Sequence, residues 1–144
     1  YEKEFNKVKS VIKKVIDEGS AQRAAIQGYT AGGKTGTAEL YIGGKNKNKY
    51  SSEKHTGLFA GIAPLKNPKL VIVVVIDQPN NEKFGGVVAA PVFKKIATDS
   101  LRILNISPDN IDAYEKKVLN KVKKQNSYTY KNPEVNNVFW INWY

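Results

Sequence analysis

The sequence predicts an α+β fold in which an antiparallel sheet of three consecutive strands is flanked by helices. Strand-like segments at about residues 29–41, 56–63 and 69–77 follow one another through short connections, which favours antiparallel neighbours. Apolar residues recur at helical spacing before and after these segments. A chain of 144 residues is expected to form one domain or part of one.

Residues 1–18 are predicted to form the first helix. Its apolar positions share one face at helical spacing, lysines occupy the other, and Gly19 favours its end. The first strand, residues 29–41, follows and contains Lys34-Thr35-Gly36-Thr37. A polar, glycine-led loop at residues 43–49 separates it from the next strand.

The second strand, residues 56–63, is rich in small residues, and Pro64 to Pro68 form a predicted turn. The third strand, residues 69–77, holds an apolar run from Leu70 to Ile76. Such a run predicts that both faces of the strand are buried, as in a central strand covered by helices on both sides.

The remainder of the chain is predicted to be largely helical. A helix at residues 87–104 follows the loop 78–86, and Pro91 either lies in its first turn or kinks it. A last helix is predicted at residues 109–124, and the aromatic segment 127–144 is predicted to be irregular.

The composition of the chain narrows the range of partners and cofactors that we expect. The net charge is +10, but only two of the 23 basic residues are arginine, the side chain that suits phosphate clamping and base reading. We therefore expect a lysine-rich solvated surface and no nucleic-acid partner. Cysteine is absent and His55 is the single histidine, so we expect no metal or other cofactor. The chain starts at Tyr1 and lacks methionine, so we expect it to be part of a longer protein.

The segment Lys34-Thr35-Gly36-Thr37 carries the chemistry that we expect. The lysine supplies a positive charge and the threonines supply hydroxyl donors. Gly36 lets a substrate approach the strand without meeting a Cβ. Together they suit the binding of a carboxylate beside an acyl-transfer site, and Lys-Thr-Gly is one of the motifs of penicillin-binding proteins and class A β-lactamases.

The flanking sequence resembles the C-terminal half of the transpeptidase domain of penicillin-binding proteins, most closely the class B, division-type branch. Four segments match in the family's order, and Glu18-Gly19-Ser20-Ala21 also fits, so that the resemblance covers about residues 7–108. The four segments are Gly33 to Ala38, His55 to Pro64, Leu70 to Asp77 with Pro79, and Phe84 to Phe93.

The resemblance implies a D,D-transpeptidase that cross-links peptidoglycan stem peptides through an acyl-serine intermediate and is acylated by β-lactams. Residues 1–108 would be the C-terminal portion of that domain, and residues 109–144 a C-terminal helix and aromatic tail. Implied partners are D-Ala-D-Ala peptides, β-lactam antibiotics, the N-terminal half of the same protein and divisome proteins. The implied location is the extracytoplasmic face of the cytoplasmic membrane (periplasm), with an anchor upstream.

The resemblance also assigns roles to the Lys-Thr-Gly strand. Lys34 and the hydroxyls of Thr35 and Thr37 would bind the terminal carboxylate of the substrate or of a β-lactam. The backbone N–H of Thr37 would be one donor of the oxyanion hole.

The nucleophile of the family, a serine in Ser-x-x-Lys, is expected to lie outside this chain. Two such strings occur, Ser10 to Lys13 and Ser51 to Lys54, but one is mid-helix and the other lies in a lysine-rich loop. Neither context predicts the desolvated amine that a Ser-Lys pair needs. No Ser-x-Asn occurs, so the chain alone is predicted to be inactive.

Other polar residues are expected to be structural. His55 is predicted to lie at a strand edge and Asp77 to cap a strand or turn, while Glu39 and Glu53 are expected to be exposed charges. Gly85-Gly86 is predicted to form a turn and the start of a helix rather than a phosphate cradle.

Two alternatives share the fold: a serine β-lactamase, and a non-catalytic sensor domain that binds β-lactam or cell wall. Ala63-Pro64 and the run Ala89 to Phe93 favour the transpeptidase over the β-lactamase.

Overall fold

The computed structural model describes residues 2–43, 50–80, 82–112, 115 and 120. The chain divides into a unit of residues Tyr1–Asn110 and a second unit of residues Ile111–Tyr144. The second unit is helical at its four described residues, 111, 112, 115 and 120. The predicted helix 109–124 therefore lies mostly outside the described residues, and the aromatic segment 127–144 lies entirely outside them.

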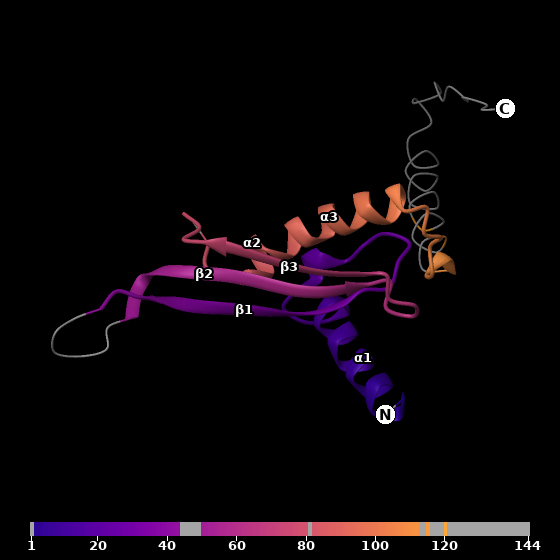
Figure 1. Ribbon diagram of the computed structural model, residues 1–144, viewed down its shortest axis with the longest axis horizontal. Coiled ribbons are helices and arrows are strands. Elements are labelled where there is room, and N and C mark those ends of the chain that lie inside the picture. The colour runs from indigo at the N-terminus through magenta and orange to yellow at the C-terminus, as the bar shows by residue number, and fades with distance from the viewer. Residues whose placement is uncertain (1, 44–49, 81, 113–114, 116–119, 121–144) are drawn as a thin grey trace, which may run out of the picture. The chain divides into compact units, whose positions relative to one another are not determined.

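The first unit contains a three-stranded antiparallel sheet in the order β1-β2-β3 (Figure 1). The strands are β1 Gly32–Tyr41, β2 Tyr50–Ala63 and β3 Leu70–Asp77. The predicted α+β class and the antiparallel order are confirmed. Strand β1 begins later than predicted, because Tyr29 N–H bonds to the Ile26 carbonyl in a turn. Strand β2 is longer than predicted and already begins at Tyr50.

The helices are α1 Glu2–Asp17, the short 3₁₀ helix η1 Gln22–Ala24, α2 Gly85–Val88 and α3 Ala90–Ile103. The single helix predicted at residues 87–104 is thus two helices that meet at Ala89. Pro91 lies in the first turn of α3, where its missing N–H breaks no helical bond. No helix in the described ranges is long and apolar enough to cross a bilayer.

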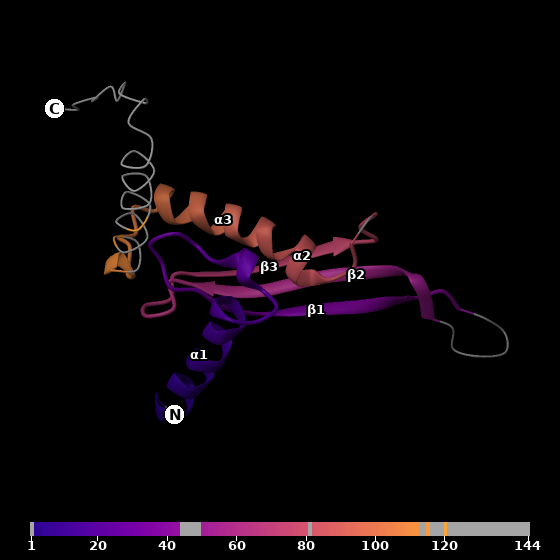
Figure 2. The same ribbon diagram turned by 180° about the vertical axis from the view of Figure 1, so that it is seen from behind.

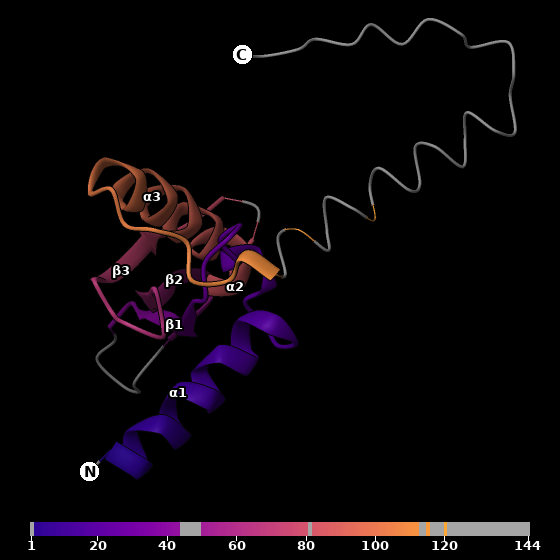
Figure 3. The ribbon, with the colours of Figure 1, turned by 90° about the vertical axis from the view of Figure 1, so that its right-hand side faces the viewer.

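Helices α1 and α3 cover opposite faces of the sheet, which Figures 2 and 3 show from two directions. A Cβ built on Gly32 would meet the Ile12 side chain of α1, whereas a Cβ built on Gly61 would meet the Phe93 ring of α3. Gly61 pairs with Gly33, the neighbour of Gly32, and successive residues of a strand face opposite sides. Helix α1 therefore lies against one face at the Gly32 end of β1, and α3 lies against the other face.

The core lies between the sheet and α3. Phe59 of β2 and Phe93 of α3 are fully buried, with their rings edge-to-face and 4.9 Å between centroids. Leu101 of α3 and Val74 of β3 extend this core along the sheet. Strand β2 is the centre of the sheet, because it pairs with both neighbours. It also carries the fully buried Phe59.

The prediction that both faces of the third strand are buried is wrong for the part of the chain that the structure describes. Val74 is 7% exposed, but Val71, Val73 and Val75 on the other face are 74%, 63% and 58% exposed. Helix α3 covers only one face, and β3 lies at an edge of the sheet. We call the face opposite α3 the open face; by strand pairing it comprises Leu58, Ala60, Ile62, Val71, Val73 and Val75, and α1 contacts it at the Gly32 end of β1.

Candidate active site

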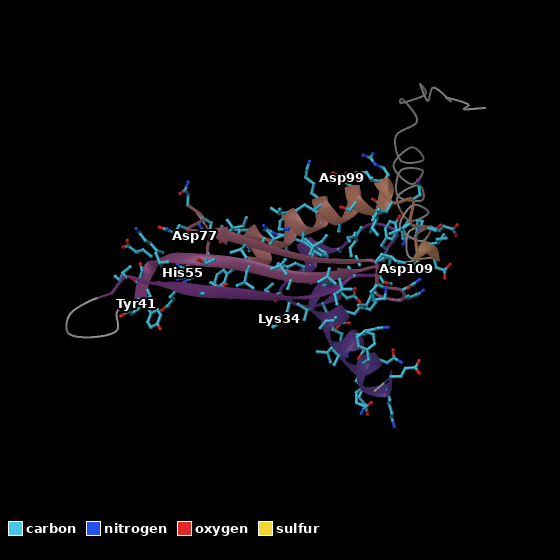
Figure 4. All side chains as sticks on the ribbon, in the orientation of Figure 1. Lys34, Tyr41, His55, Asp77, Asp99 and Asp109 are labelled. Atoms are coloured by element: carbon cyan, nitrogen blue, oxygen red, sulfur yellow. The ribbon has the colours of Figure 1, made fainter. Side chains whose placement is uncertain are left out.

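Lys34-Thr35-Gly36-Thr37 lies within β1, as predicted. Strand β1 is at the edge of the sheet, so one of its sides pairs with β2, and its other side is unpaired within the described part of the chain. Figure 4 shows Lys34 on β1, on the side of the sheet away from α3. An edge strand presents backbone N–H and C=O groups to whatever binds beside it.

Strand alternation separates the lysine from the two hydroxyls. Lys34 pairs with Ala60 and therefore lies on the open face, whereas Thr35 pairs with Phe59 and lies on the α3 side. Side chains from the two faces can therefore reach the same ligand only at the free edge of β1. Lys34 bends toward its own strand, because its Nζ donates a hydrogen bond of 2.8 Å to the Thr35 carbonyl.

The two threonine hydroxyls have hydrogen-bond partners on the α3 side of the sheet. Thr35 Oγ1 shares a hydrogen bond of 3.1 Å with Ser20 Oγ, and Thr37 Oγ1 accepts a long bond of 3.4 Å from Gly85 N–H. Sequence reasoning did not single out Ser20 as a site residue. The sequence signal that could have indicated Ser20 is its place in the short segment Glu18 to Ala21, between α1 and η1.

Gly85 and Gly86 bring the start of α2 into contact with the site strand. A Cβ on Gly85 would lie 2.2 Å from the Leu58 carbonyl oxygen and 2.5 Å from that of Gly36. A Cβ on Gly86 would lie 2.0 Å from the Ser20 carbonyl oxygen. The predicted helix start is confirmed, and the glycines have a further reason: no side chain fits between α2 and the backbone of the site.

Gly36 has a packing role as well as the expected open approach. A Cβ at this position would lie 2.6 Å from Cδ1 of Leu58, the residue opposite it on β2. The Leu58 side chain therefore occupies the space beside Gly36 on the open face. A larger residue here would displace either that leucine or a molecule bound along the strand.

The two Ser-x-x-Lys strings do not form Ser-Lys pairs among the described contacts. Ser10 Oγ donates to the Lys7 carbonyl at 2.7 Å, and Lys13 is paired with Asp17 on α1. Ser51 Oγ accepts hydrogen bonds from the backbone N–H groups of Glu53 and Lys54, at 3.2 and 2.9 Å. Both serines therefore serve local backbone structure. The prediction that Ser51 lies in a loop is wrong, because Ser51 to Lys54 are part of strand β2.

His55 does not lie at a strand edge, so that prediction is wrong. It lies within the central strand β2, opposite Glu39, because β2 begins six residues earlier than expected, and it is 6% exposed. Asp77 ends β3 and accepts a 2.9 Å hydrogen bond from the Thr56 hydroxyl, as a strand-end role predicts (Figure 4). Glu39 and Glu53 are exposed, as predicted.

No metal site is evident in the described ranges, where no three acidic or histidine side chains group in a way that could hold an ion. The groups that β1 offers are one ammonium, two hydroxyls and backbone amides. These donors bind anions such as a carboxylate.

Comparison with known proteins identifies the family. The family model for the penicillin-binding protein transpeptidase domain matches residues 2–98, and the chain belongs to this family. It is 43% identical over 104 residues to a probable peptidoglycan D,D-transpeptidase PenA of Neisseria flavescens (71% of this chain, 25% of that protein). It is 46% identical over 95 residues to the peptidoglycan D,D-transpeptidase FtsI of Buchnera aphidicola (65% and 16%).

A solved structure agrees with these relatives. The apo transpeptidase domain of penicillin-binding protein 3 from Burkholderia pseudomallei has a TM-score of 0.62 at 38% identity, over 70% of this chain and 30% of that one. The predicted class B branch and its fold are therefore confirmed. The chain spans a quarter or less of the length of the two curated relatives, so it is part of the domain that they contain.

The glycine contact predicts a sensitive position. In the full-length protein, we expect Gly86→Ala to lower stability by about 1–3 kcal/mol, because a backbone carbonyl cannot yield as a side chain can. Thermal unfolding measures this effect. Glu82→Ala, at an exposed position before α2, is the control. A Gly86→Ala protein with normal stability would contradict the contact.

Proposed function

We propose that this chain is the C-terminal portion of the catalytic domain of a peptidoglycan D,D-transpeptidase. The intact enzyme would cross-link stem peptides by forming an acyl-serine with a D-Ala-D-Ala peptide and passing the acyl group to an amine. The observation that carries the proposal is the placement of Lys34-Thr35-Gly36-Thr37 on the free edge of a sheet strand, inside a segment matched by the transpeptidase family.

The free edge of β1 supports a role in binding the substrate's terminal carboxylate. In our proposal Lys34 reaches this edge from the open face, and the Thr35 and Thr37 hydroxyls reach it from the α3 side. A carboxylate at the edge would then receive one charged and two neutral hydrogen bonds. β-Lactams carry a carboxylate in a comparable place, so we propose that they occupy the same edge.

The backbone of Thr37 is proposed as an oxyanion-hole donor. In an antiparallel edge strand, every second residue directs its N–H and C=O away from the neighbouring strand. The Thr35 carbonyl accepts a bond from the Lys34 side chain, which supports an outward direction for Thr35 and thus for Thr37. A donor held on a strand needs no reorganisation as charge develops on the acyl oxygen.

The open face supports the upstream half of the same protein as the partner that completes the site. Its valines on β3 are more than half exposed, and so are Phe5, Val8 and Val11 of α1. Apolar area of this extent favours burial. Lys34 lies on the same face. We propose that upstream elements cover it and bring the nucleophilic serine to the edge of β1.

The setting follows from the same proposal. Residues 1–108 would belong to the transpeptidase domain and residues 109–144 to a C-terminal extension. Because peptidoglycan is assembled outside the cytoplasm, the domain would act on the extracytoplasmic side of the cytoplasmic membrane, in the periplasm. An upstream anchor and contacts with divisome proteins belong to this proposal too.

Acylation by a labelled penicillin tests the proposal. We expect the full-length protein to form a long-lived acyl-enzyme, and residues 1–144 alone to form none, because the chain lacks the nucleophile. Rapid hydrolysis of the penicillin would instead indicate a serine β-lactamase. Stable acylation without cross-linking of stem peptides would indicate a sensor domain. Stoichiometric acylation of the isolated chain would refute the incomplete-site account.

Lys34 offers a direct test of the carboxylate site. We expect Lys34→Ala in the full-length protein to reduce the second-order rate of acylation by roughly 10- to 100-fold, because hydrogen bonds to charged groups contribute about 1.5–3 kcal/mol. Lys54→Ala, which removes an exposed lysine of β2, is the control and should leave the rate unchanged. Equal rates for the two variants would show that Lys34 does not bind the carboxylate.

A further inference from the structure

Thr30 is a buried hydrogen-bonding centre just before the site strand. It lies two residues ahead of β1 and is 7% exposed. Its backbone N–H donates to Asp109 Oδ1 at 2.6 Å, and its hydroxyl donates to Asp109 Oδ2. Leu65 N–H donates at 3.0 Å to both the hydroxyl oxygen and the carbonyl oxygen of Thr30. Every polar group of Thr30 is therefore engaged.

Further bonds join the same three segments. Asn110 N–H donates to the Gly28 carbonyl at 3.1 Å, and the Tyr29 hydroxyl donates to the Ile106 carbonyl at 2.6 Å. Lys66 Nζ donates to the Asp109 carbonyl at 2.7 Å. Together these bonds connect residues 28–30, 65–66 and 106–110. Figure 4 shows Asp109 at the end of the sheet where β1 begins.

Asp109 lies eleven residues beyond the family match, which ends at residue 98. It nevertheless belongs to the same compact unit, which ends at Asn110. The residues after α3 are therefore attached to the turn that leads into β1. The transpeptidase portion proposed above then ends at residue 110 instead of residue 108.

We propose that Asp109 is a positioning residue for the active site, which acts through Thr30 to fix where β1 lies. The inference rests on the proposed function. Lys34 is four residues from Thr30, about 13 Å along a strand that rises 3.3 Å per residue. Strand β1 is paired with β2 from Gly32 onward, two residues after Thr30, so Lys34 and Thr37 belong to one hydrogen-bonded ladder that starts next to Thr30. A shift at Thr30 is therefore passed to Lys34 and Thr37.

The chemistry of the carboxylate explains why an aspartate is used. One carboxylate accepts two hydrogen bonds from the same threonine, which fixes both the position and the rotation of that residue. Without it, the buried Thr30 N–H has no acceptor, and the turn must move to find water or another partner. Active-site donors must stay within about 0.5 Å of their productive positions, so a small movement is enough to slow acylation.

The test compares acylation of full-length variants by a fluorescent penicillin, expressed per folded protein. Asp109→Ala should lower the second-order acylation constant by roughly tenfold, since a displacement of 1 Å can cost about a hundredfold. Asp109→Asn keeps an oxygen acceptor for the Thr30 N–H and should restore the constant to within about threefold of wild type. Asp112→Ala, at an exposed aspartate three residues later in the sequence, is the matched control and should match wild type.

A double-mutant cycle separates positioning from general stability. Thr30→Val removes the hydroxyl and should lower the constant, while Thr30→Ser should restore it. In the Asp109→Ala background, Thr30→Val should cause little further loss, because the two residues act on the same strand through one contact. If Asp109→Ala does not fold, the Thr30→Val and Thr30→Ser pair decides the question.

The outcomes are distinct. Tenfold loss, rescue by Asp109→Asn and a non-additive cycle support the positioning role. A folded Asp109→Ala protein that is acylated at the wild-type rate overturns it, as do losses that multiply in the double variant or a Thr30→Val protein with normal acylation. A wild-type protein that is not acylated refutes the proposed function, and this inference with it. A normal wild type with unchanged variants refutes this inference alone.

Discussion

The register between β1 and β2 is the constraint on which the rest of the structure depends. The Phe59 ring lies against Gly33, where a Cβ would be 2.5 Å from Phe59 Cζ, and Phe93 lies as closely against Gly61. The rings of β2 and α3 therefore fill the space that two paired glycines leave empty. A slip of one residue would put side chains where the rings are and would exchange the faces of Lys34 and Thr35.

This register divides the site into a finished part and an unfinished part. On the α3 side, Ser20 and Gly85 contact the hydroxyls of Thr35 and Thr37, so these groups are held before any ligand arrives. On the open face, Lys34 shares its side of the sheet with the exposed valines of β3, and its ammonium bonds only to the carbonyl of the next residue among the described contacts. The first part is preorganised, and the second is the part that we propose the upstream half of the protein completes.

The sequence predicted what depends on local patterns. Helical spacing located α1, and the strand carrying Lys34 was recognisable from its own residues and from matching neighbours. The apolar run of β3 misled, because such a run cannot tell whether its cover belongs to the same chain. His55 was misplaced because the length of β2 depends on pairing with β1. The Thr30–Asp109 contact joins residues 79 apart, which periodicity does not report.

The central claim is that this chain supplies the carboxylate-binding wall of an acyl-serine site and that the nucleophile comes from elsewhere in the protein. The most direct measurement is to acylate the full-length protein with a labelled penicillin, digest it and identify the labelled residue by mass spectrometry. The account predicts a single labelled serine upstream of Tyr1. A label on Ser10, Ser51 or any other hydroxyl of residues 1–144 would contradict it.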